Sequence, residues 1–231
     1  FFYQMNDLYP HTGDFDYQFT TVANRWLEAV NAMGGQTTPW QVPNMDHRGW
    51  YLQIMSPEDN GVHEPEAAGA IAWLFYNAYV KTGDPRYRIG AEQAMEFLDS
   101  RTSNPSYELQ LSYGTYLAAR MNAELGTSYN IPQMVNWCFD IGPLRSWGAI
   151  TGNWGGYDVS GLIGEVNGVN NYAFAMNTFE QVGCLVPMTR YDPRFARAIG
   201  KWVLNAANAA RLFYPNYLPE NHQDSYQWAQ Q

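Results

Sequence analysis

Four carboxylates in or beside two long irregular stretches of the sequence are of the residue type that acid–base chemistry requires. Glu64 and Glu66 flank Pro65 at an expected helix start, and Asp158 and Glu165 lie in a glycine-rich stretch much later in the chain. Hydrolysis of a glycosidic bond needs two carboxyl groups beside the bond, one of them kept protonated by burial or a like charge. We expect one carboxylate from each stretch to meet, Glu66 with Asp158 or with Glu165.

Each of these carboxylates also has a purely structural interpretation. Acidic side chains stabilise helix N-termini, which would account for Glu64 and Glu66. Asp158 suits a turn in which its side chain accepts a backbone hydrogen bond, and Glu165 suits an exposed loop. The sequence leaves both interpretations open.

The same two stretches are rich in aromatic and amide side chains. Aromatic residues reach 16% of the chain, and flat rings with polar edges suit neutral, hydroxyl-rich ligands. The alternative is that the tryptophans pack over helix ends. The candidate substrate-binding residues are Trp40, Trp50, Trp147, Trp154, Tyr157, Asn171, Tyr172 and His63.

Elimination from a uronate is a second chemistry that these residues could perform. Tyr172 or Tyr157 would remove the proton beside the uronate carboxylate, and Asn171, Asn167 or Arg145 would neutralise that carboxylate. The two stretches contain only two arginines. A uronate substrate favours more of them, so hydrolysis ranks above elimination. A non-catalytic glycan-binding module, which would keep the aromatic residues without needing paired carboxylates, and a helical-repeat scaffold that binds protein are the further alternatives.

A metal or cofactor site is not expected. His47 and His63, with Asp46 and Glu64, contain ligand-type side chains, but their spacing matches no compact ligand motif. The sequence also has no phosphate-binding loop or dinucleotide fingerprint.

Composition limits the partners. The net charge is −9, which disfavours nucleic acid and anionic membranes, and no run of 18 apolar residues predicts a membrane span. We interpret the chain as a mature or trimmed part of a longer protein and expect it to be secreted or periplasmic. The oligomeric state is not predicted. Cys138 and Cys184 both have apolar neighbours, which favours buried thiols over a disulfide.

An internal repeat indicates how these residues are positioned. The sequence Asp-Pro-Arg-aromatic occurs at 84–87 and again at 192–195. Asp accepts hydrogen bonds from the free N–H groups of a new helix, and Pro fits its first turn. Each copy therefore predicts a tight turn between two antiparallel helices.

Apolar periodicity then predicts an all-α fold of stacked antiparallel helical hairpins over residues 1–214, followed by a polar tail or linker at 215–231. The irregular stretches 34–65 and 142–170 both precede apolar helices of inner type and should emerge at the same end. A short strand is expected only at 50–55. The expected helices are 16–33, 66–82, 85–101, 106–125, 131–140, 171–191 (with a kink at Pro187) and 193–214.

The helix–TGDPRY–helix pattern resembles the (α/α) toroids of carbohydrate-active enzymes, the glycoside hydrolases and polysaccharide lyases. The resemblance rests on residues 67–87 and 171–197. It implies a partial toroid or open arc, with catalytic carboxylates on loops leading into inner helices. The resemblance therefore also indicates Glu64, Glu66, Asp158 and Glu165. Asn170-Asn171-Tyr172 is similar to the Asn-Asn-His-x-Tyr motif of some alginate lyases, without its His.

Overall fold

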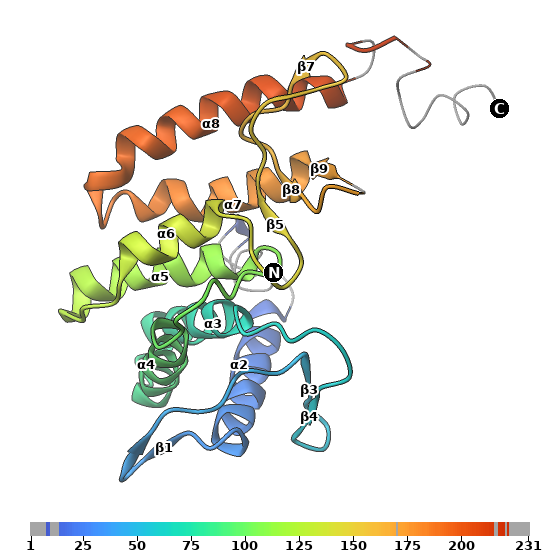
Figure 1. Ribbon diagram of the computed structural model, residues 1–231. Coiled ribbons are helices and arrows are strands. Elements are labelled where there is room, and N and C mark those ends of the chain that lie inside the picture. Colours follow the sequence, from blue (N-terminus) through green and yellow to red (C-terminus); the bar gives the residue numbers. More distant parts are fainter. Residues whose placement is uncertain (1–7, 10–13, 170, 215–216, 220, 222–231) are drawn as a thin grey trace.

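The computed structural model describes residues 8–9, 14–169, 171–214, 217–219 and 221. Within these residues, three helices form an inner row in which α5 packs against both α3 and α7. Three outer helices, α4, α6 and α8, pack against α3, α5 and α7 respectively, and α2 packs against α3 and α4 (Figure 1). The bounds are α2 Phe15–Ala32, α3 Ala67–Thr82, α4 Pro85–Asp99, α5 Gln110–Leu125, α6 Ile131–Phe139, α7 Ala175–Met188 and α8 Ala196–Ala210.

The two Asp-Pro-Arg tetrads begin helical segments, as the sequence predicts. The Asp84 carboxylate accepts a hydrogen bond from the Arg86 backbone N–H at 3.0 Å, and Pro follows in the first turn of α4. Asp192 accepts from the Arg194 N–H at 3.3 Å. The second tetrad opens a short 3₁₀ helix, η1 (Pro193–Phe195), before α8 begins. A second 3₁₀ helix, η2 (Arg211–Phe213), follows α8.

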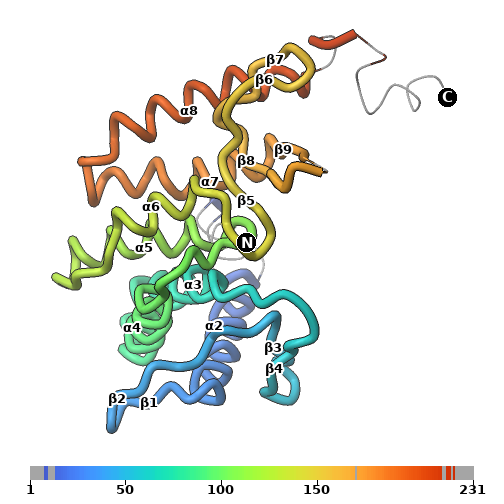
Figure 2. The backbone as a smooth tube through the Cα atoms, viewed as in Figure 1, coloured from blue at the N-terminus to red at the C-terminus, as the bar shows by residue number. Residues whose placement is uncertain are grey.

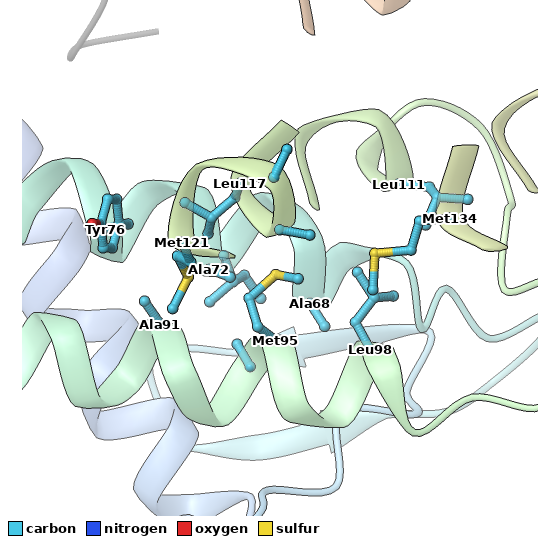
Figure 3. Packing of buried hydrophobic residues seen from close by; sticks show 14 of the residues in the cluster. Ala68, Ala72, Tyr76, Ala91, Met95, Leu98, Leu111, Leu117, Met121 and Met134 are labelled. Atoms are coloured by element: carbon cyan, nitrogen blue, oxygen red, sulfur yellow. The ribbon is translucent and has the colours of Figure 1, made fainter. Parts of the chain in front are cut away.

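The inner helices approach one another closely because glycines face each other at their crossing. A Cβ atom added to Gly69 of α3 would lie 2.8 Å from the Cα of Gly114 in α5. Around this crossing the core is filled by small and flexible side chains such as Ala72, Met95 and Met121 (Figure 3). Methionine adapts to irregular gaps, which suits helices packed at this short distance.

The expected all-α class is wrong. The structure is about 54% helix and 11% strand, a mixed α/β composition. The strands lie in the long connections and form small antiparallel sheets: β1 (Gln36–Thr37) with β2 (Trp40–Gln41), β3 (Gly49–Tyr51) with β4 (Ser56–Glu58), β6 (Asn153–Trp154) with β7 (Tyr157–Asp158), and β5 (Trp147–Ala149), β8 (Ile163–Glu165) and β9 (Tyr172–Phe174) in the order β5-β8-β9. Strands of two or three residues are too short to show the alternation by which a strand is recognised.

Several expected helix boundaries differ from those of the structure. The expected helix 171–191 starts only at Ala175, because the residues before it form β9. Pro187 is the second-last residue of that helix, so it does not interrupt the helix interior. The helix expected from 106 begins at Gln110. Most of the expected tail at 215–231 lies outside the described residues.

Cys138 and Cys184 are both buried free thiols, so no disulfide joins them. Among the described residues, every helix is too short or too polar to cross a membrane.

The inner helices all start at the same end of the molecule. The chain enters α3 from the β3–β4 hairpin, α5 from the connection after α4, and α7 from the β5-β8-β9 sheet (Figure 2). These three connections therefore emerge together, and we call this the loop end. The β1–β2 hairpin lies away from it, beside the far end of α2 (Figure 1).

Candidate functional site

Arg145 is the centre of a polar cluster at the loop end. Its Nε donates to Glu165 Oε2 at 3.2 Å, its Nη2 donates to the Tyr172 hydroxyl at 2.9 Å, and it forms an ion pair with Glu108. Its guanidinium carbon also lies 5.3 Å from the ring centre of Trp147. We call Arg145, Glu64, Glu108, Glu165 and Tyr172 the Arg145 cluster.

The three-stranded sheet positions two members of this cluster, Glu165 and Tyr172. Glu165 of β8 lies opposite Trp147 of β5 and opposite Tyr172 of β9. Residues directly opposite in an antiparallel sheet point to the same face, so these three side chains lie together. A Cβ atom added to Gly164 would lie 2.0 Å from the Tyr172 carbonyl oxygen, so only glycine allows this close strand pairing.

The environment holds Glu165 in its ionised form. The Tyr172 hydroxyl donates to Glu165 Oε2 at 2.5 Å, and this bond lowers the pKa of Glu165 below its ordinary value. Hydrogen bonds from Arg145 and Asn167 lower the pKa further. The carboxylate remains partly open, with 18% of its side chain exposed, so it can still meet a ligand.

Glu64 experiences the opposite effect. Burial raises the pKa of Glu64, while the charges of Arg48 and Arg145 partly offset that rise. Two carboxyl groups under the influence of Arg145 therefore have pKa values shifted in opposite directions, one toward the neutral acid and one toward the carboxylate. Such a division is how pairs of carboxyl groups take acid and base roles at one pH.

Glu66 is fully buried and has a structural role. Its Oε1 accepts from the Glu108 backbone N–H at 2.5 Å, and its Oε2 accepts from the Leu111 backbone N–H at 3.1 Å. Burial raises the pKa of Glu66 to about 8, although hydrogen bonds from backbone N–H groups, that of Leu111 above all, act in the other direction. The carboxyl group thus joins the start of α3 to the start of α5, and it has no exposed surface for substrate.

The expected pairing of Glu66 with Asp158 is not formed. Asp158 is exposed on the β6–β7 hairpin and lies beside the last turns of α8, away from α3 (Figure 1). Its Oδ1 accepts from the Ser160 N–H at 2.9 Å, which is the turn that the structural interpretation predicts. The segment after this hairpin is held against α8, because the Trp202 indole N–H donates to the Gly161 carbonyl at 2.8 Å.

The four loop tryptophans do not form one stacking surface. Trp147 is 1% exposed and packs in the core, so it cannot stack on a sugar. Trp40 lies on the distant β1–β2 hairpin, and its indole N–H donates to Glu96 at 2.7 Å. Trp154 packs against the small apolar cluster under the β6–β7 hairpin. Trp50 alone lies near Glu64, with which it lines a small cavity of about 50 Å³.

The histidines of the first loop pair with two carboxylates, and Asp59 lies near both histidines, since His63 Nε2 is 3.8 Å from Asp59 Oδ1. His63 Nδ1 lies 3.1 Å from Asp46 Oδ1, and His47 Nδ1 lies 2.9 Å from Asp59 Oδ1. No group of three or more potential ligands is placed to hold a metal ion in the part of the chain that the structure describes. His63 is therefore positioned by Asp46, next to Glu64 in the chain.

The remaining candidates divide between the two parts of the second loop. Asn171 is exposed, and its side-chain oxygen accepts from the Gly168 N–H at 2.8 Å to close a turn. Tyr172 belongs to the Arg145 cluster, whereas Tyr157 lies with Asp158 beside α8.

Sequence reasoning missed Glu108. The expected helix 106–125 includes Glu108, whereas the residue lies in the connection before α5. Pro105 just before it is the available signal that the chain is irregular here. The connection between α4 and α5 also enters an inner helix at the loop end, and there the Glu108 carboxylate pairs with Arg145.

Comparison of the chain with protein-family models, with curated proteins and with solved structures found no match.

Proposed function

We propose that the loop end binds a poly- or oligosaccharide and hydrolyses it, with the Arg145 cluster as the catalytic centre. The observation that carries the proposal is that Glu108 and Glu165, from two separate connections, form ion pairs with a single arginine whose charge also acts on Glu64 of a third connection. Carboxyl groups with perturbed pKa values are frequent at catalytic sites. The resemblance to carbohydrate-active toroids supports the same substrate class.

The proposed roles follow from the pKa directions. Glu64, with its raised pKa, is the general acid that protonates the leaving oxygen. Glu165, with its lowered pKa, is the carboxylate that activates water or attacks the sugar. Arg145 and Tyr172 hold Glu165 in place through its Oε2 atom. General acid–base catalysis of this kind contributes about 10²–10⁴-fold in rate.

Elimination is the second candidate, because Arg145 donates a hydrogen bond to the Tyr172 hydroxyl oxygen at 2.9 Å. A tyrosine hydroxyl held in place by an arginine can act as the base that elimination requires. Elimination ranks second because Arg145 is already paired with Glu108 and Glu165. These pairs leave it less able to neutralise a uronate.

The test is a reducing-end assay over a panel of neutral and uronate-containing oligosaccharides. Glu64→Gln and Glu165→Gln should each lower the rate by about 10²-fold or more without abolishing binding. Glu92→Gln is the matched control, because this carboxylate pairs with Arg88 on α4, and its rate should equal that of the wild type. Unsaturated products that absorb ultraviolet light would show elimination instead. Binding that survives both variants, with no reaction by any of the three proteins, would identify a non-catalytic glycan-binding module.

A further inference from the structure

A cleft of about 210 Å³ lies between the β6–β7 hairpin and α8. Tyr157 and Asp158 contribute one wall, and Asn205, Asn208 and Arg211 contribute the other. Asn205, Asn208 and Leu212 are spaced by three and four residues and so share one face of the helical segment. The Arg145 cluster contributes no residue to this cleft.

The two asparagine side chains of this cleft are available to a ligand. Among the described residues, the side-chain amides of Asn205 and Asn208 form no hydrogen bond, and both residues are exposed. A larger cleft of about 550 Å³ between α2 and α4 differs in this respect. There, Gln93 already donates to backbone carbonyls, and Asn24 accepts from the Tyr87 hydroxyl.

The chemistry of the smaller cleft favours a neutral, hydroxyl-rich ligand. Amide groups both donate and accept, as sugar hydroxyls require, and the tyrosine ring offers a flat apolar face with a polar edge. Asp158 and Arg211 contribute one charge of each sign, so the lining has no net attraction for an anion. Pockets for drug-sized ligands are about 300–1,000 Å³, so this smaller space suits a single sugar residue.

We propose that this cleft is a second saccharide-binding site, separate from the Arg145 cluster, that holds one neutral sugar residue of a longer chain. The ligand class rests on the proposed function as well as on the side chains of the cleft. Asp158, a catalytic candidate from the sequence, and Tyr157, a substrate-binding candidate, belong to this second site. The protein would then bind the polysaccharide at two separate sites.

The test is a titration of the ¹⁵N-labelled protein with glucose, galactose, mannose and xylose, and with glucuronate as the charged comparison, followed by NMR. At least one neutral sugar should cause saturable shifts in the side-chain amide signals of Asn205 and Asn208. Asn208→Ala should weaken this binding by about tenfold. The variant should fold, because alanine favours a helix and the site is exposed.

Asn31→Ala is the matched control, since Asn31 is an exposed helical asparagine that lines the larger cleft. It should bind sugar as the wild type does. The proposal is overturned by the absence of saturable shifts at Asn205 and Asn208 with every sugar, by tighter binding of glucuronate, or by a loss caused by Asn31→Ala instead of Asn208→Ala. The proposed function is tested separately, because Glu64→Gln and Glu165→Gln alter hydrolysis and neither residue lines this cleft.

Discussion

The Glu66 carboxylate of the α3 start accepts a hydrogen bond from the Leu111 backbone N–H at the start of α5, at 3.1 Å. Because its other oxygen accepts from the Glu108 N–H, the buried carboxyl group fixes two inner helices and the connection that carries Glu108. The group that sequence reasoning assigned to catalysis thus positions a residue of the site without contacting a ligand.

Glu66 should make stability depend on pH. Its pKa is about 8 in the folded protein, against an ordinary value of 4.5, so the folded state holds this proton more tightly than the unfolded chain does. The contribution is therefore fully present below pH 4.5 and is lost as the pH rises through 8, by at most about 5 kcal/mol. Urea denaturation at several pH values measures it.

Glu66→Gln isolates this contribution from all other titrating groups. The neutral amide resembles the protonated acid, so the variant should lose less stability than the wild type between pH 5 and 8. Equal slopes for the two proteins would show that Glu66 has an ordinary pKa. Glu66→Ala should destabilise the protein by about 2–4 kcal/mol, because it leaves two buried N–H groups without an acceptor.

Tyr172→Phe should raise the pKa of Glu165. The Tyr172 hydroxyl is the strongest of the contacts that lower that pKa, and the phenyl ring keeps the packing while removing the donor. A titration of the ¹³C-labelled glutamate carboxyl signals measures the shift directly, whether or not a substrate is known. Tyr157→Phe is the control, since its hydroxyl lies in the cleft beside α8. A Glu165 pKa that stays the same in Tyr172→Phe would contradict the role given to this bond.

The helices were predictable because their signals are local. The Asp84 and Asp192 tetrads contain the capping residue and the proline within four positions, and the apolar periodicity extends over several turns. Most strands were not predictable: the strand expected at 50–55 overlaps only the last two residues of β3, and pairs such as Asn153–Trp154 with Tyr157–Asp158 depend on a turn and on packing against α8. The intrinsic β-propensity of two residues is too small to predict a strand.

The candidate site was predicted in part. Glu64, Glu165 and Tyr172 were named as candidates, and they lie around Arg145. Sequence gives the loop in which a residue lies, but not the direction in which a hairpin within that loop points. The second loop contains both Glu165 in β8 and Asp158 in β7, and the two hairpin regions contact different helices. Asp158 was therefore assigned to the wrong place.

The crossing of α3 and α5 should tolerate no added side chain. Gly69→Ala and Gly114→Ala would each place a Cβ atom 2.8 Å from the opposing glycine Cα, and helix backbone cannot move aside as a flexible side chain can. Each variant should lose about 1–3 kcal/mol of unfolding free energy, measured by urea denaturation. Gly183→Ala in α7 is the matched control, because nothing lies within 4 Å of its added Cβ.

That control should gain about 0.5–1 kcal/mol, since alanine favours a helix over glycine. A gain in all three variants would mean that α3 and α5 are farther apart than the structure has them. Because the start of α5 and the connection before it carry the backbone groups that bind Glu66, the two destabilised variants should in addition broaden the NMR signals of Glu108 and Leu111.

The cap at Asp84 offers a test of how the helical hairpins are fixed. Asp84→Ala removes the acceptor of the Arg86 N–H at the start of α4 and should cost about 1 kcal/mol. Asp84→Asn keeps an oxygen in the same position and removes only the charge that faces the Arg86 guanidinium. This ion pair is exposed, and exposed pairs contribute little. The Asn variant should therefore remain within about 0.5 kcal/mol of the wild type in thermal or urea unfolding. Equal losses in the two variants would assign the effect to the charge, and the Asp-Pro-Arg tetrad would then act through its arginine and not through its cap.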